Sequence, residues 1–81
     1  MNRDALRQAI LEELSDIAPD IDTAGVKDTE ILREEYDLDS MDVMNLLIAI
    51  HKRLQVDIPE RDYGRMQTLG ELLDYIERQS Q

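Results

Sequence analysis

Apolar residues recur every three or four positions in three stretches of this 81-residue chain, and this spacing most constrains its fold. In the first stretch the pattern is formed by Leu6, Ile10, Leu14 and Ile17. Side chains at this spacing share one face of an α-helix, whereas strict alternation would indicate a β-strand. We find no strand alternation, hairpin signal or internal repeat. The sequence therefore predicts an all-α fold, and its length indicates one domain over residues 1–81.

Residues that begin or end helices divide the chain into three main helices and a short one. Asn2 can cap the first helix, and Pro19 marks its end. The second main helix runs from about Ser40 to Leu54, with a core stripe of Val43, Leu47, Ile50 and Leu54. Met41, Met44 and Ile48 form a second apolar stripe on a neighbouring face. A helix this apolar is expected to touch neighbours on several sides.

The other two helices lie in the last third of the chain. The run Ile58-Pro59-Glu60 places proline at the first helical position of a short segment that ends near residues 64–66. The run Thr68-Leu69-Gly70-Glu71 fits a capping box that opens the closing helix. We predict a small four-helix bundle in which the third helix is the short one.

Residues 18–39 form a long acidic loop before the central helix. They show little periodicity, and we expect only a short turn near residues 30–34, pinned by Ile31, Leu32 and Leu38. Residues 28–42 hold seven acids against a single base, Arg33, and the whole chain has a net charge of −10. Such a charge repels nucleic acid phosphates and anionic membranes, and it steers basic protein partners toward the chain. Long loops in small domains are often functional.

One serine lies among the acids of the stretch DLDSMD, residues 37–42, where the central helix begins. Asp39 is a good N-cap, and Asp42 lies three residues later, where a capping-box partner would be. Ser40 would then lie in the first turn with its side chain at the surface. Alternatively, Ser40 itself is the cap and Asp39 merely precedes it. A phosphate on Ser40 would lie in the favourable field of a helix start.

Several kinds of active site are excluded by residue type or spacing. There is no cysteine, and the only histidine, His51, lies eleven residues after Ser40 on the same predicted helix. At 1.5 Å per residue the two are about 16 Å apart, so a serine–histidine pair cannot form. A calcium loop counted from Asp37 would need Gly and Glu where Asp42 and Ile48 stand. We expect neither a catalytic nor a metal site.

The segment Leu38-Asp39-Ser40-Met41-Asp42 resembles the Asp-Ser-Leu/Met attachment motif of acyl carrier proteins. The resemblance covers nearly the whole chain, since Val56-Asp57-Ile58-Pro59 resembles the opening of the family's third helix and Thr68 through Ile76 its closing helix. It implies a single acyl-carrier domain over residues 1–81 and a stand-alone carrier. Ser40 would receive 4′-phosphopantetheine from coenzyme A through a phosphopantetheinyl transferase. The thiol of this arm would hold acyl groups as thioesters.

The resemblance also implies roles for residues around Ser40. The expected partner-docking residues are Asp39, Met41, Asp42, Met44 and Ile48, although ordinary core packing is an equal alternative for Met44 and Ile48. The expected lining of an acyl cavity is Val43, Leu47, Ile50 and Leu73. Met66, with Met41 and Met44, suits a varying cargo because methionine adapts to irregular shapes.

The chain departs from the family at the basic run His51-Lys52-Arg53, where the central helix usually stays acidic. This run favours a specialised carrier over the general carrier of fatty-acid synthesis. We expect a cytoplasmic protein, because no apolar stretch approaches about 20 residues and the polar start is no signal peptide. We also expect a monomer, and not an enzyme, since no catalytic site is assembled. The alternatives are a carrier of amino acids, peptides or polyketides, and a helical adaptor that is never modified.

Overall fold

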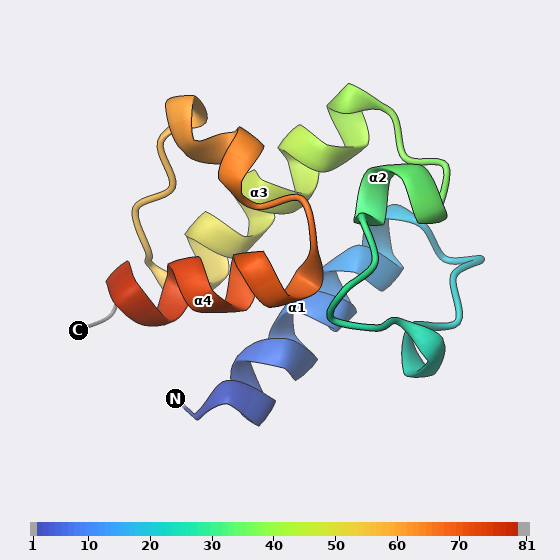
Figure 1. The fold of residues 1–81 in the computed structure, drawn as a ribbon, viewed down its shortest axis with the longest axis horizontal. Helices are drawn as coiled ribbons and strands as arrows, with labels where there is room; N and C mark the ends of the chain where they lie inside the picture. The colour runs from blue at the N-terminus through green and yellow to red at the C-terminus, as the bar shows by residue number, and fades with distance from the viewer. Residues whose placement is uncertain (1, 80–81) are drawn as a thin grey trace.

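The computed structural model describes residues 2–79, which form helices joined by loops (Figure 1). The elements are α1 (Arg3–Ile17), η1 (Thr23–Gly25), α2 (Leu32–Glu35), α3 (Ser40–Leu54), η2 (Glu60–Arg65) and α4 (Leu69–Gln79), where η marks a 3₁₀ helix. Within this range the only β-type pairing is a single bridge between Ile31 and Thr68. The all-α prediction is confirmed. None of the described helices is long and apolar enough to span a membrane.

The two long helices α1 and α3 begin and end close to the residues that predict their ends. The Asn2 side chain accepts a hydrogen bond from the Ala5 amide at 2.8 Å, and α1 ends at Ile17, two residues before Pro19. In α3, Leu47 and Ile50 are buried as predicted, while Val43 and Leu54 are only half-buried. Leu46, which lies outside the predicted stripe, is 2% exposed. The buried face of α3 is therefore rotated slightly from the predicted one.

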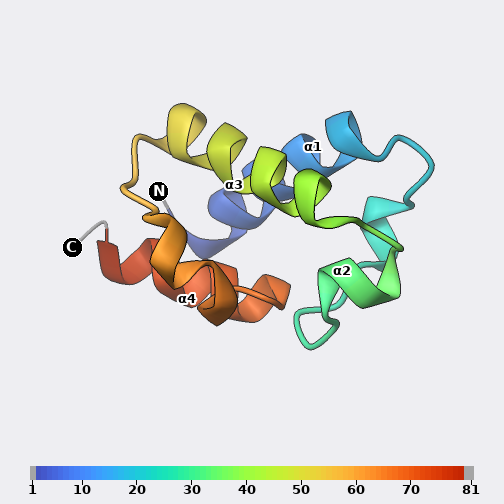
Figure 2. The same ribbon diagram turned by 90° about the horizontal axis from the view of Figure 1, so that it is seen from above.

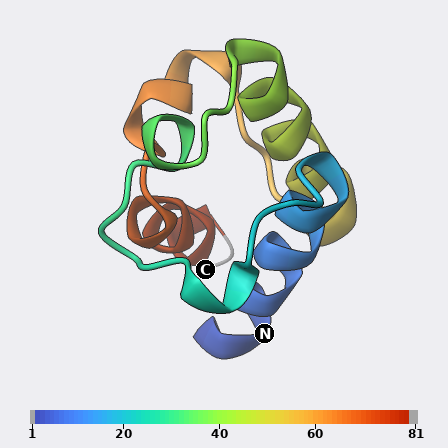
Figure 3. The ribbon, with the colours of Figure 1, turned by 90° about the vertical axis from the view of Figure 1, so that its right-hand side faces the viewer.

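The helices pack around one apolar core. Figure 2 shows α1 and α3 side by side, with α4 across from them. Seen end-on in Figure 3, α1, α3 and α4 are arranged around a common centre, and the loop with α2 runs along the rim nearest the viewer. The fully buried large side chains come from α1, α3 and α4: Ile10, Leu14, Leu47, Ile50, Leu69, Leu72, Leu73 and Ile76. Each such burial contributes about 1.5–3 kcal/mol relative to exposure, so this core supplies most of the stabilisation.

The loop before α3 is fastened to the start of α4 by backbone contacts. The Leu32 amide donates to the Gln67 carbonyl at 3.0 Å, and the Gly70 amide donates to the Asp28 carbonyl at 2.9 Å. A Cβ on Gly70 would lie 3.1 Å from that carbonyl oxygen, so glycine permits the close approach. Arg7 of α1 pairs with the Asp28 carboxylate at 2.6 Å. These contacts hold α2 against the bundle. Compared with the predicted turn near residues 30–34, α2 begins two residues later and ends one residue later.

The short helix η2 differs from its prediction at its first residue. Pro59 was predicted at the first helical position, but its backbone is extended (ψ 145°) and the helix begins at Glu60. The Asp62 amide donates to the Pro59 carbonyl at 2.9 Å, so Pro59 is the cap of a 3₁₀ helix. The Tyr75 hydroxyl donates to the Asp62 carboxylate at 2.6 Å and holds η2 against α4.

Candidate functional site

Ser40 is the first residue of α3, and the residue before it caps the helix. The Asp39 carboxylate accepts from the Asp42 amide at 2.8 Å, and the Asp42 carboxylate accepts from the Asp39 amide at 3.2 Å. This reciprocal pair is a capping box. Asp39 is therefore the N-cap, and the alternative that Ser40 caps is wrong. Ser40 is exposed, and its hydroxyl forms no hydrogen bond within residues 2–79.

A tight turn after α2 brings Ser40 beside that helix. Asp37 has a left-handed backbone (φ 55°), and the Leu38 amide donates to the Arg33 carbonyl at 3.0 Å. This bond, from the second residue past the cap to the third-last helical residue, is the main bond of a Schellman motif. Leu38 then packs into the core at 6% exposure. The turn thus reverses the chain so that the start of α3 faces α2.

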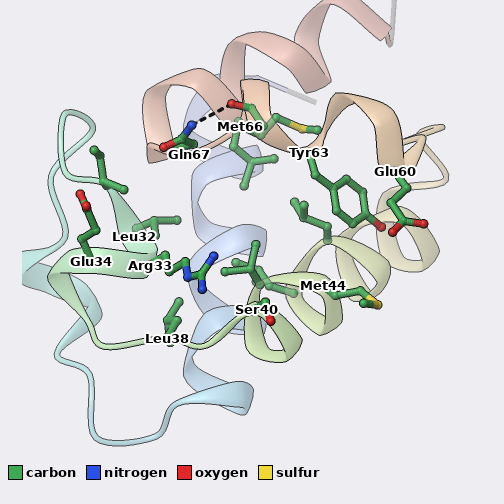
Figure 4. Close-up of a pocket in the computed structure, with 16 residues that line it drawn as sticks. Leu32, Arg33, Glu34, Leu38, Ser40, Met44, Glu60, Tyr63, Met66 and Gln67 are labelled. Atoms are coloured by element: carbon green, nitrogen blue, oxygen red, sulfur yellow. Dashed lines mark hydrogen bonds between the residues drawn. The ribbon is translucent and has the colours of Figure 1, made fainter.

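A pocket of about 490 Å³ opens beside Ser40, and its walls are α2, the start of α3, η2 and the segment before α4 (Figure 4). Its volume falls within the usual range for small-molecule sites. The apolar lining is Ile31, Leu32, Leu38, Val43, Met44, Leu46, Leu47, Met66 and Leu72. The polar lining is Arg33, Glu34, Ser40, Glu60, Tyr63 and Gln67, with Gly64 between them. The site therefore combines a free hydroxyl with an apolar recess.

The expected docking residues differ in exposure. Met41 is 56% exposed and Ile48 is 37% exposed, which are large values for apolar side chains. Met44 is half-buried and lines the pocket. Asp39 is exposed and Asp42 half-buried. Two apolar side chains are thus exposed on α3, with Met41 next to Ser40 and Ile48 about two turns further along the helix.

The expected cavity residues divide into two groups. Val43 and Leu47 line the pocket, and so does Met66. Ile50 and Leu73 are buried in the core and are not part of the pocket lining. Sequence reasoning did not assign Arg33 or Tyr63 to the site, although both line the pocket. For Arg33 the one available signal was its place as the single base in an acidic stretch.

The basic run at the end of α3 is partly used inside the chain. Nδ1 of His51 lies 2.7 Å from the Val56 carbonyl, and because a carbonyl only accepts, this nitrogen carries the proton. Arg53 pairs with Glu12 at 2.6 Å and with Glu13 at 3.1 Å. The hydrogen bond from Arg53 lowers the pKa of Glu12 below its usual value. Two of the three basic residues therefore have partners inside the chain: His51 bonds to the segment after α3, and Arg53 joins α3 to α1.

Ser40 is exposed, forms no side-chain hydrogen bond within residues 2–79 and lines an apolar pocket, an arrangement that is compatible with a covalently attached group. A family model described as "Phosphopantetheine attachment site" matches residues 4–76. The chain therefore carries 4′-phosphopantetheine covalently, and the free Ser40 hydroxyl fits such an attachment.

Similar proteins narrow the class of phosphopantetheine carrier to which the chain belongs. The chain is 28% identical over 75 residues to "Acyl carrier protein" of Campylobacter curvus, covering 93% of this chain and 91% of that protein. It is 26% identical over 74 residues to "Acyl carrier protein" of Wolinella succinogenes, covering 91% of each. It is 24% identical over 79 residues to "Acyl carrier protein, mitochondrial" of Saccharomyces cerevisiae, covering 94% of this chain and 63% of that protein. The chain belongs to the acyl carrier protein family.

Proposed function

We propose that Ser40 is the residue that carries 4′-phosphopantetheine and that the chain presents acyl groups to partner enzymes. The observation that supports this most is the Ser40 hydroxyl, exposed and without a hydrogen bond within residues 2–79. Asp39 makes the capping contact in its place. A phosphopantetheinyl transferase would move the arm from coenzyme A onto this hydroxyl.

The arm supplies a terminal thiol, which holds an acyl group as a thioester in a chain that has no cysteine. The chain itself presents the cargo and does not catalyse its conversion. Tethering gives the cargo a high effective concentration at each partner's active site.

The surface around Ser40 supports brief docking to basic enzymes. Asp39 and Asp42 carry negative charge beside the attachment point, and Met41 and Ile48 expose apolar area on α3. Charge complementarity speeds the encounter. Because the exposed apolar area is small, it adds little affinity, and the complex dissociates quickly. We propose Asp39, Met41, Asp42, Met44 and Ile48 as the docking residues.

The pocket beside Ser40 suits the shelter of an acyl chain. Val43, Leu47 and Met66 line it, and the methionines can adapt to cargo of varying shape. Ile50 and Leu73 lie deeper and would line an enlarged cavity. The pathway we propose is fatty-acid, lipid or related biosynthesis. The internal contacts of His51 and Arg53 reduce the support for a specialised pathway, since that prediction used their charge.

Intact mass spectrometry after incubation with a phosphopantetheinyl transferase and coenzyme A tests the assignment. Wild type and Ser15→Ala should both gain one phosphopantetheinyl group, and Ser40→Ala should gain none. Ser15 is the matched control because it is the other serine within residues 2–79. A wild type that gains no mass would support the unmodified adaptor instead. If Ser40→Ala still gains the phosphopantetheinyl group, another residue carries the arm.

A further inference from the structure

Arg33 is a positive side chain beside the proposed attachment point. It lies in α2, is exposed, and lines the same pocket as Ser40. Figure 4 shows its guanidinium extending from α2 toward the first turn of α3, where Ser40 lies. Among the residues that line the pocket, it is the only cation. The Schellman turn that ends α2 fixes this arrangement, because the Arg33 carbonyl accepts from the Leu38 amide.

The guanidinium of Arg33 is free for a ligand, unlike several other arginines of the chain. Arg3 pairs with Asp74, Arg7 with Asp28, and Arg53 with Glu12. Arg33 forms no ion pair or side-chain hydrogen bond within residues 2–79, although Glu34 and Glu35 are its neighbours in sequence. Although the surrounding segment is acidic, no acid of the described chain therefore pairs with the Arg33 guanidinium.

A phosphodiester on Ser40 would add a negative charge close to Asp37, Asp39 and Asp42. Like charges at such short range raise the free energy of the modified form. A guanidinium offsets this repulsion well, since its planar fork can donate two parallel hydrogen bonds to a phosphate. We propose that Arg33 binds the phosphodiester of the arm on Ser40. The contact holds the start of the arm against the α2 wall of the pocket, next to the apolar recess. This inference rests on the proposed function of Ser40.

Phosphorus NMR of the modified protein tests the contact directly. The samples are wild type, Arg33→Gln, Arg33→Lys and the control Arg61→Gln, each shown by intact mass to be modified. Arg61 is an exposed arginine of η2 outside the pocket lining. Arg33→Gln should shift the phosphodiester resonance, Arg33→Lys should shift it less, and Arg61→Gln should leave it unchanged. The Arg33 Nε–H signal should also move when wild type is modified.

Melting temperatures of unmodified and modified protein give a second readout. Arg33→Gln should lower the melting temperature of the modified protein more than that of the unmodified protein. Arg61→Gln should lower both by the same amount. This comparison separates binding of the phosphate from a general role of Arg33 among the acids, because a general role would affect both forms equally.

Three results would overturn the proposal in different ways. If wild type gains no mass, the proposed function of Ser40 and the role of Arg33 fail together. If the mass rises but neither the resonance nor the melting difference responds to Arg33→Gln, the Arg33 contact alone is wrong. If a response appears only after loading a malonyl group and not an acetyl group, Arg33 binds a cargo carboxylate and not the phosphodiester.

Discussion

At the scale of single residues, the start of α3 uses two side chains for two roles. Asp39 caps the helix, and Ser40 offers a free hydroxyl for attachment. Serine is a good helix cap, but a capping hydroxyl accepts a hydrogen bond from the backbone. Here Asp39 accepts that bond from the Asp42 amide. The Ser40 hydroxyl consequently stays at the surface with no partner in the described chain. The sequence left both capping arrangements open, because aspartate and serine are equally good caps.

Asp39→Ala should lower the free energy of unfolding by about 1 kcal/mol, the usual loss when a helix cap is removed. Asp39→Asn should lower it much less, since the amide oxygen can still accept the Asp42 amide while the charge is lost. Urea denaturation of the three proteins measures the difference. Equal stability of the alanine and asparagine variants would show that the cap contributes nothing.

At the scale of elements, periodicity predicts the long helices but not how the loop and α2 attach to them. The limits of α1 and α3 follow from Asn2, Pro19 and Asp39, whose effects are local. The bond between the Leu32 amide and the Gln67 carbonyl joins residues far apart in sequence. Backbone contacts of this kind leave no pattern in residue type, so the walls of the pocket could not be predicted.

The position of Arg33 beside Ser40 could not be predicted from the sequence either, for a related reason. It depends on the left-handed turn at Asp37, a conformation that glycine would have indicated and aspartate does not. The ion pairs between helices could not be predicted from the sequence either. Arg53 belongs to the basic run that favours a specialised carrier, but it pairs with Glu12 and Glu13 of α1.

Tyr36, the C-cap residue of α2, contacts the loop before that helix. This contact predicts that the folded state loses stability at alkaline pH. The Tyr36 hydroxyl donates to Glu30 at 2.5 Å, and burial followed by this bond raises the pKa of Tyr36 from 10.0 to about 12. A raised folded-state pKa adds stability that is complete below the unfolded-state pKa. That stability disappears as the pH rises from 10.0 to about 12.

Tyr36→Phe should therefore lose less stability than wild type on going from about pH 8 to about pH 11. Urea denaturation at the two pH values gives the comparison. Part of the alkaline loss should remain in the variant, because burial also raises the pKa of Tyr75. An identical loss in both proteins would mean that the Tyr36 contact does not stabilise the fold.

At the scale of the whole molecule, charge is the main opposing force. The chain has 19 acids against nine Lys and Arg, and several of those arginines already pair with acids across helices. Seven of the 19 acids lie between residues 28 and 42, in the segment that leads into the attachment point, and of these only Asp28 forms an ion pair within residues 2–79. The same acids that would attract basic partners thus repel one another in the folded state.

Added sodium chloride or magnesium should raise the melting temperature. Screening weakens both the repulsion between acids and the ion pairs, but the excess of acids makes the loss of repulsion dominate. Calorimetry across a salt series measures the trend. A flat or falling melting temperature would show that the ion pairs outweigh the repulsion.

Peptide mapping by tandem mass spectrometry of protein from its native cell shows whether Ser40 carries the arm. We predict that the peptide containing Ser40 bears phosphopantetheine on that serine, free or with an acyl group whose mass reveals the cargo. Unmodified Ser40, with the group absent or attached to another residue such as Ser15, would contradict the account.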